Sequence, residues 1–271
     1  MKLLLTGKPR SGKTTLLGEL LKLIDTKQGF LVREVRKDGE RVSFDLVSAD
    51  GHLATLASVE SESPIRVSRY GVELDNFETF ILDLPDPQPG ILLYLDEIGQ
   101  MELLSEHFKA FAQRYLDANN NYLGTLSSVY EDAFTRKVRL REDVLIVEVT
   151  PDNRDEVKAA LLPLVHNLYK LSALPKKTQQ AVLEQAKHYA SAADYLRLKK
   201  LFNNAIKYLS EGRIDVAEDG TYPVRGDHGS YRVQLNEGAW SCECDLFNGK
   251  AEYEGNAGEC SHILVAKLFI G

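Results

Sequence analysis

A glycine-rich loop close to the start of the chain constrains its fold more than any other stretch. A short apolar strand is predicted over residues 2–6 and an apolar helix over residues 15–24. The segment between them has the pattern G-x-x-x-x-G-K-T, whose glycines let backbone N–H groups surround a phosphate at the N-terminus of the helix. The sequence therefore predicts a phosphate-binding loop. The residues expected to bind the nucleotide are Gly7, Lys8, Pro9, Arg10, Ser11, Gly12, Lys13, Thr14 and Thr15.

Two side chains of this loop have specific expected roles. Lys13 is expected to meet the β- and γ-phosphates, and the hydroxyl of Thr14 to ligate Mg²⁺. The strand before the loop and the helix after it are the context that this motif requires.

A second signature follows the apolar run at residues 91–95, which ends in Asp96 and Glu97. A run that is apolar on both faces is typical of a central parallel strand, and its carboxyl end lies where ligands bind in open α/β sheets. We expect Asp96 to hold Mg²⁺ opposite Thr14. Glu97 is expected to orient or deprotonate the attacking water, so Lys13, Asp96 and Glu97 are the predicted catalytic residues.

The first part of the chain alternates between strand and helix patterns. This alternation predicts an α/β fold with a mostly parallel sheet and helices on both faces. A β-hairpin is expected over residues 30–47, with Asp38-Gly39 in its turn, and residues 61–71 are expected to form a loop. Further strands are predicted over 53–59, 122–126 and 144–149, and helices over 76–84, 103–116, 131–140 and 152–164.

The pattern changes in the last hundred residues. A linker at 171–175 precedes a basic helical stretch over 176–210, and short strands are then predicted over 214–217, 222–225, 231–235 and 239–242, before a helix over 263–270. We predict three parts: a P-loop domain at 1–168, a basic helical linker at 169–211 and a small α+β zinc-binding domain at 212–271.

All three cysteines of the chain lie in this last part. Cys242-x-Cys244 and Cys260-x-His262 together supply three thiolates and one imidazole, which is the ligand set of a closed, structural Zn²⁺ site. Because a domain this small lacks a sufficient core, zinc binding is expected to contribute to its folding.

The N-terminal motifs resemble the cancer-related and thermophile nucleoside-triphosphatase family. The resemblance covers roughly residues 1–168 and is most specific in Asp96-Glu97-Ile98-Gly99-Gln100-Met101-Glu102-Leu103, with further support from Leu123-Gly124-Thr125 and from Val149-Thr150-x-x-Asn153-Arg154. It implies a P-loop enzyme of the RecA-like side that hydrolyses several ribonucleoside triphosphates slowly to diphosphate and phosphate.

This chain departs from the family pattern in the phosphate-binding loop. The loop usually has a glycine where Arg10 or Ser11 stands, and Arg10 is either an in-cis stabiliser of transition-state charge or a solvated loop residue. Arg136, Arg139 and Arg154 are the other candidates for such charge stabilisation, and each is alternatively a surface or ion-pairing residue.

The C-terminal ligands resemble the SWIM zinc finger, in which Cys-x-Cys is followed by Cys-x-His. The strand pair before Cys242 and the helix after His262 follow the same order. This resemblance implies a module that binds DNA or a protein partner.

The net charge of −7 argues against a nucleic-acid binder with a uniformly basic surface. The basic stretch at 170–207 is either a solvated helix face or a site for a phosphate backbone. Because the sequence has no apolar run of membrane-spanning length, we expect a soluble, cytoplasmic protein with no membrane partner.

The sequence thus predicts Mg²⁺-dependent hydrolysis of nucleoside triphosphates, ATP among them, combined with a zinc finger for DNA, RNA or a protein. Two alternatives stay open. The first is a P-loop kinase that phosphorylates a nucleoside, nucleotide or small alcohol, with the hairpin at 30–47 as a substrate lid. The second is a nucleotide-controlled switch that binds nucleic acid or protein through its C-terminal part.

Overall fold

The computed structural model describes residues 1–190, 195–245 and 259–270. These residues form two compact units, Met1–Asp155 and Glu156–Gly271. The predicted three-part division at residues 168 and 211 stays a prediction.

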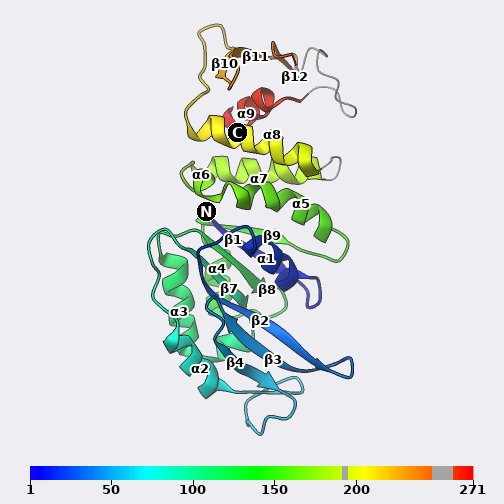
Figure 1. Ribbon diagram of the computed structural model, residues 1–271, viewed down its shortest axis with the longest axis vertical. Helices are drawn as coiled ribbons and strands as arrows, with labels where there is room; N and C mark the ends of the chain where they lie inside the picture. Colours follow the sequence, from blue (N-terminus) through cyan, green and yellow to red (C-terminus); the bar gives the residue numbers. More distant parts are fainter. Residues whose placement is uncertain (191–194, 246–258, 271) are drawn as a thin grey trace. The chain divides into compact units, whose positions relative to one another are not determined.

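A nine-stranded sheet forms the centre of the first unit, in the order β5-β6-β4-β3-β2-β7-β8-β1-β9 (Figure 1). Strands β2, β7, β8, β1 and β9 pair in parallel, whereas β3, β4, β6 and β5 extend the sheet by antiparallel pairing. The predicted α/β class is confirmed, with a mixed sheet whose parallel half contains the predicted phosphate-binding loop. The strands are β1 Lys2–Gly7, β2 Lys27–Lys37, β3 Glu40–Ser48, β4 Leu53–Ser58, β5 Arg66–Val67, β6 Tyr70–Val72, β7 Leu92–Ile98, β8 Tyr122–Ser127 and β9 Val144–Glu148.

Strand β7, which contains Asp96 and Glu97 near its carboxyl end, and its neighbour β8 lie in the middle of this sheet. Every residue of β8 is buried, and only Glu97 of β7 is partly exposed. Strand β8 separates β7 from β1, which leads into the loop, and β9 pairs with the other edge of β1. The carboxyl ends of β1, β7 and β8 therefore lie together at one edge of the sheet.

Helices and aromatic side chains complete the core of the first unit. Phe30 on β2 packs 5.7 Å from Phe80 and 6.1 Å from Phe108, measured between ring centroids. These contacts join the sheet to two amphipathic helices and bury their apolar faces. The helices of this unit are α1 Lys13–Leu21, α2 Leu74–Asp83, the 3₁₀ turn η1 Glu102–Leu104, α3 Glu106–Asp117 and α4 Ala133–Arg139.

Residues 61–71, expected to form a loop, contain β5 and the start of β6, so this expectation was wrong in part. Tyr70, Gly71 and Val72 are buried, and the ring of Tyr70 packs 5.0 Å from that of Phe44 on β3. The local sequence does not reveal this buried strand, which lies between β5 and β4, because its contact partner Phe44 is distant in sequence.

The second unit contains helices and a small antiparallel sheet. Helix α9 is apolar almost throughout and buries Ile263, Leu264 and Val265. Its helices and strands are α5 Arg154–His166, which begins in the first unit, α6 Leu168–Ser172, α7 Lys176–Ala190, α8 Tyr195–Ser210, β10 Tyr222–Arg225, β11 Ser230–Asn236, β12 Ala239–Cys242 and α9 Ser261–Ile270. No helix in the described part of the chain is long and apolar enough to span a membrane.

Three local expectations in this unit need correction. Helix α5 includes Pro163 and continues to His166, past the predicted end at residue 164, because the neighbouring apolar residues Leu161, Leu164 and Val165 are buried and hold the helix together. Helix α6 occupies part of the predicted linker at 171–175. Residues 214–217 form a single bridge between Ile214 and Val224 and not a strand.

Candidate functional site

The predicted phosphate-binding loop connects β1 to α1, and its two glycines allow close backbone approach. A Cβ atom on Gly7 would overlap the carbonyl oxygen of Val149. Gly12 caps α1 with φ at 95°, and a Cβ atom there would lie 2.7 Å from Cδ of Arg154. Only glycine fits both positions without strain. Lys8, Pro9 and Arg10 are exposed along the loop.

Lys13 is buried at the start of α1 and turns back over the loop. Its Nζ donates to the carbonyl oxygen of Gly7 at 3.0 Å and lies 3.6 Å from Oε2 of Glu97. Beside it, Ser11 Oγ is buried and has no hydrogen-bond partner among the described residues. The loop therefore holds a cation and an unsatisfied hydroxyl group together, as an anion site requires.

Asp96 is fully buried at the carboxyl end of β7. Its Oδ1 accepts from Thr14 Oγ1 at 3.1 Å and from Thr125 Oγ1 at 2.5 Å, and its Oδ2 accepts from the Val32 N–H at 3.3 Å. Burial raises the pKa of this carboxyl group, and the hydrogen bonds from Thr125 and Thr14 partly oppose that rise.

Glu97 lies next to Asp96 but is partly open to solvent, with 28% of its side chain exposed. Burial raises the pKa of Glu97; the charge of Lys13 opposes this rise, and the charge of Asp96 adds to it. The two carboxylates thus differ in access: Asp96 accepts from fixed donors inside the sheet, whereas Glu97 is partly exposed beside Lys13.

The oxygen atoms near Thr14 suit a Mg²⁺ ion. The Thr14 hydroxyl and the Asp96 carboxylate are 3.1 Å apart, and Mg²⁺ prefers such hard oxygen ligands. The side chain of Thr14 is exposed, so the remaining coordination positions would be open to water and phosphate oxygens.

Three further residues complete the surroundings of the two carboxylates, and none of them has a role predicted from the sequence. Thr125 binds Asp96, and a hydrogen bond with Ser127 contributes to the pKa of Glu97. Glu102 is buried, and burial together with the charge of Glu97 holds the pKa of Glu102 well above its usual value. For Thr125 and Ser127 the available signal was the presence of two hydroxyl side chains in an apolar strand, because buried polar side chains need partners.

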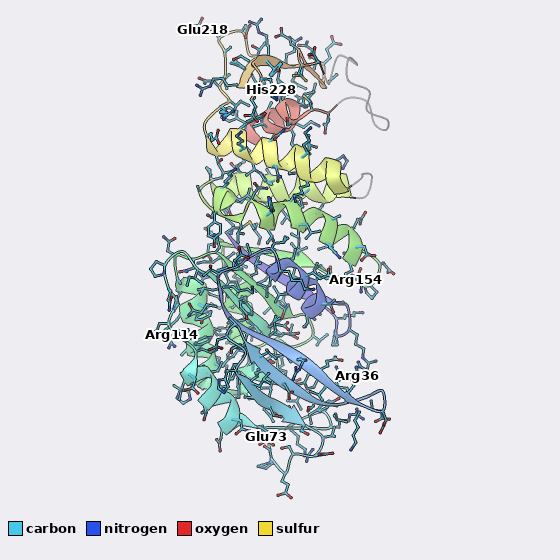
Figure 2. The ribbon with its side chains drawn as sticks, viewed as in Figure 1. Arg36, Glu73, Arg114, Arg154, Glu218 and His228 are labelled. Atoms are coloured by element: carbon cyan, nitrogen blue, oxygen red, sulfur yellow. The ribbon has the colours of Figure 1, made fainter. Side chains whose placement is uncertain are left out.

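The four candidate arginines lie in different places. Arg154, at the start of α5 (Figure 2), lies against Gly12 of the loop. Arg139 donates to the carbonyl oxygen of Ser127, and Arg136 is exposed with Nε 3.5 Å from Oε1 of Glu131. Arg10 is exposed with φ at 69°, a left-handed conformation that is unusual for arginine.

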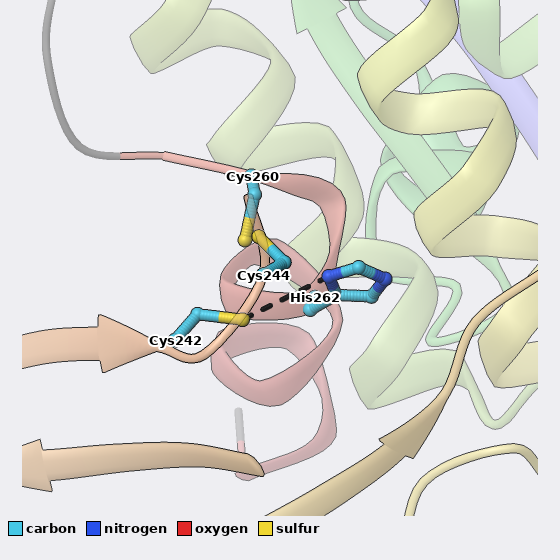
Figure 3. A group of neighbouring side chains, drawn as sticks. All are labelled: Cys242, Cys244, Cys260 and His262. Atoms are coloured by element: carbon cyan, nitrogen blue, oxygen red, sulfur yellow. Dashed lines mark hydrogen bonds between the residues drawn. The ribbon is translucent and has the colours of Figure 1, made fainter. Parts of the chain in front are cut away.

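The four predicted zinc ligands come together in the second unit. Figure 3 shows Cys242, Cys244, Cys260 and His262 facing one another, and their ligand atoms all lie within 4.8 Å of each other. All four side chains are buried. Zn–S distances of about 2.3 Å place tetrahedral sulfur atoms about 4 Å apart, so these residues fit a zinc ion. Most of the chain between Cys244 and Cys260 lies outside the described residues.

Two aromatic rings hold the imidazole of His262. The ring of Tyr231 stacks on it at 4.3 Å and that of Tyr208 at 5.8 Å, measured between centroids. Nδ1 lies 3.8 Å from Sγ of Cys242, and Nε2 lies near Gly226, where a Cβ atom would be 2.8 Å away. Nδ1 is therefore the ring nitrogen that faces the sulfur atoms.

Comparison with known proteins agrees with the geometry of the first unit. A family model described as NTPase matches residues 2–162. The chain belongs to this NTPase family. It is 35% identical over 167 residues to the nucleoside-triphosphatase THEP1 of Thermotoga sp. (strain RQ2), covering 61% of this chain and 95% of that protein. It is 31% identical over 182 residues to the cancer-related nucleoside-triphosphatase homolog of Mus musculus, covering 60% of this chain and 95% of that protein.

A solved structure of the same NTPase family has the same fold. The crystal structure of THEP1 from the hyperthermophile Aquifex aeolicus aligns with a TM-score of 0.53 and 28% identity, and covers 61% of this chain and 99% of that chain. The predicted enzyme class, a nucleoside-triphosphate phosphatase, is thus confirmed at the level of the family. The SWIM-type identity of the C-terminal part stays a prediction.

Proposed function

We propose that this chain hydrolyses nucleoside 5′-triphosphates to diphosphate and phosphate, with Mg²⁺ as cofactor. The observation that supports this most strongly is the convergence of Lys13, Thr14, Asp96 and Glu97 at one edge of the sheet. Membership of the NTPase family and the nucleoside-triphosphatase names of its relatives support the same reaction.

Each of these residues has a distinct task in the proposed reaction. The loop N–H groups and Lys13 bind the β- and γ-phosphates, and the free hydroxyl of Ser11 can donate to a phosphate oxygen. Thr14 and Asp96 would hold Mg²⁺, which neutralises charge on the phosphates when bound. Glu97, which is accessible and has a raised pKa, orients water for in-line attack on the γ-phosphate and accepts its proton.

Transfer to water is favoured over transfer to another acceptor by the position of Glu97. Its carboxylate lies beside Lys13, where the γ-phosphate would bind. A kinase would instead transfer the phosphoryl group to a bound alcohol or nucleotide. Product analysis separates the two: the proposal requires free phosphate, with no phosphorylated acceptor.

The experiment that tests the proposal is phosphate release from ATP, GTP, CTP and UTP with Mg²⁺. We expect slow release from several nucleotides by the wild type and none above background by Lys13→Ala, because the variant lacks the cation that meets the β- and γ-phosphates. Phosphate release by Lys13→Ala at the wild-type rate would contradict the assignment of Lys13.

The C-terminal Cys/His cluster supports a second proposal, a structural zinc module that binds a partner. Cys242, Cys244, Cys260 and His262 would fill all four positions of a tetrahedral zinc ion, which leaves none for a substrate. The module would therefore act in binding and not in catalysis.

We propose a protein as the partner of this zinc module. Residues 212–271 contain more acidic than basic side chains, and the described cations there have acceptors: Arg213 binds Asp227, Arg225 the Gly212 carbonyl oxygen, and Arg232 lies 3.9 Å from Asp219. Such a surface repels a phosphate backbone. DNA or RNA is the alternative, through the basic helices at 169–211. Salt-dependent binding of the full chain to single-stranded or duplex nucleic acid would favour that alternative.

A further inference from the structure

Arg154 contacts the phosphate-binding loop from the side opposite Glu97. The strand order β7-β8-β1-β9 places Glu97, on β7, on one side of β1, and Arg154, which follows β9, on the other. A Cβ atom on Gly12 would lie 2.7 Å from Cδ and 3.5 Å from Nη1 of Arg154. The guanidinium group is therefore held next to the N-terminus of α1.

The position of Arg154 is fixed by an ordered turn between β9 and α5. The Thr150 N–H donates to Oδ1 of Asn153 at 2.8 Å, and the Asn153 N–H donates to Oγ1 of Thr150 at 3.1 Å. The Val149 N–H binds the carbonyl oxygen of Thr6 at 2.7 Å, which attaches the turn to β1 just before the loop. Arg154 thus emerges from a rigid backbone and not from a free loop.

The guanidinium group of Arg154 is available to a ligand. Its side chain is 47% exposed, and Nε lies 3.4 Å from Oδ1 of the adjacent Asp155, which is also exposed. An exposed ion pair at this distance contributes little to the free energy of unfolding, so the guanidinium group can leave Asp155 for a ligand at little cost. Arg139, by contrast, is held by the carbonyl oxygen of Ser127.

The orientation of the bound nucleotide determines what Arg154 would meet. The γ-phosphate belongs beside Lys13 and Glu97, so the nucleoside must extend from the loop on the other side. We infer that Arg154 forms the nucleoside subsite and stacks its planar guanidinium on the base, an inference that rests on the proposed function. Stacking uses the face of a base and not its hydrogen-bonding edge, so it accepts purines and pyrimidines.

Binding of ADP and of inorganic triphosphate, measured by calorimetry with Mg²⁺, tests this inference. Inorganic triphosphate offers phosphates without a nucleoside. We expect Arg154→Ala to weaken ADP binding by about tenfold and to leave triphosphate binding unchanged. Arg154→Lys keeps the positive charge but lacks the planar guanidinium group, so it should weaken ADP binding nearly as much. Arg114→Ala, which removes an exposed arginine on α3 (Figure 2), is the matched control.

Two outcomes would overturn the inference. Equal loss of ADP and triphosphate affinity in Arg154→Ala would mean a phosphate contact, and unchanged ADP affinity would mean no contact. Kinetics provide a second readout, because a base contact raises KM for ATP and UTP and leaves kcat unchanged, whereas transition-state stabilisation lowers kcat. If the wild type binds ADP but releases no phosphate from any nucleotide, the proposed hydrolysis fails independently of the subsite.

Discussion

Asp96 and Glu97 are neighbours in the chain but lie in different surroundings. Asp96 is enclosed by three hydrogen-bond donors, whereas Glu97 is partly exposed beside Lys13. A carboxylate with fixed donors suits metal binding, and an accessible one suits proton transfer. The local environment therefore divides the proposed tasks between two acids of similar chemistry.

Thr125 is predicted to support the proposed Mg²⁺ site through Asp96. Thr125→Val removes the donor at 2.5 Å from Oδ1, so we expect a loss of about 1–3 kcal/mol in the free energy of unfolding. We also expect a higher Mg²⁺ concentration for half-maximal phosphate release. Urea unfolding and a Mg²⁺ titration measure the two effects.

Thr6→Val is the matched control for this prediction. Thr6 is buried in β1, and its hydroxyl donates to the carbonyl oxygen of Leu126 at 3.0 Å. This variant should lose stability and keep the wild-type Mg²⁺ requirement. Equal Mg²⁺ requirements in both variants would contradict the role of Thr125.

At the level of single residues, the sequence identified those side chains whose motifs are contiguous. Lys13 and Thr14 follow from the loop pattern, and Asp96 and Glu97 from the end of an apolar strand; the structure brings these four together. Arg154 and Gly12 lie near opposite ends of the first unit's sequence, and their contact depends on β9 pairing with β1. Local pattern could not choose Arg154 from the other arginines.

At the scale of helices and strands, Asp143 joins the amino ends of β1 and β9, away from the proposed site. Its Oδ2 lies 2.7 Å from Nζ of Lys2, and its Oδ1 accepts from Nε of Arg141 at 2.8 Å. Burial alone would raise the pKa of Asp143, but the hydrogen bonds from Arg141 and Lys2 outweigh burial and hold the pKa well below its usual value.

This cluster predicts a pH-dependent contribution to stability. Because the pKa of Asp143 is lower in the folded state, its charge stabilises the fold above the unfolded-state pKa of about 3.9, and the contribution is lost as the pH falls through the folded-state value. Asp143→Asn should cost roughly 1 kcal/mol at pH 7, after allowance for solvent screening, and less at pH 3. Urea unfolding at both pH values measures this, with the exposed neighbour Glu142→Gln as control. An equal cost at both pH values would contradict the prediction.

Most helices and strands could be predicted because their periodicity is local. The hairpin at 30–47 and the apolar strand before Asp96 are confirmed, with ends that differ by a few residues. The short strand β6 was missed because burial of Tyr70 against Phe44 is set by tertiary packing. The predicted hairpin accounts for the antiparallel pairing of β2 with β3. The continuation of the sheet through β4, β6 and β5 was not expected, since strand order is not encoded in local pattern.

At the scale of the whole molecule, the chain combines two units with separate chemistry. The first unit carries the proposed hydrolytic site, and the second carries the Cys/His cluster. The four ligands of this cluster were predictable from their spacing in the sequence. Their approach to within 4.8 Å of one another was not predictable, because it depends on how α9 packs against β10, β11 and β12.

We predict that the second unit binds one zinc ion and is stabilised by it. His262→Ala removes one of four ligands, so we expect loss of bound zinc and a lower melting temperature for this unit. His228→Ala, which removes an exposed histidine of the same module (Figure 2), should retain both. Metal analysis and calorimetry measure the effects. Full zinc content in His262→Ala would contradict the assigned ligand set.

The division of tasks between Asp96 and Glu97 is tested most directly by Glu97→Gln. Single-turnover hydrolysis of Mg·ATP and its equilibrium binding should be measured on this variant and on the wild type. We predict that hydrolysis slows by about 10²–10⁴-fold, because the base that accepts the proton of the attacking water is lost. Binding should stay within a few-fold of wild type, since Lys13, Thr14 and Asp96 remain. Hydrolysis at the wild-type rate would contradict the account.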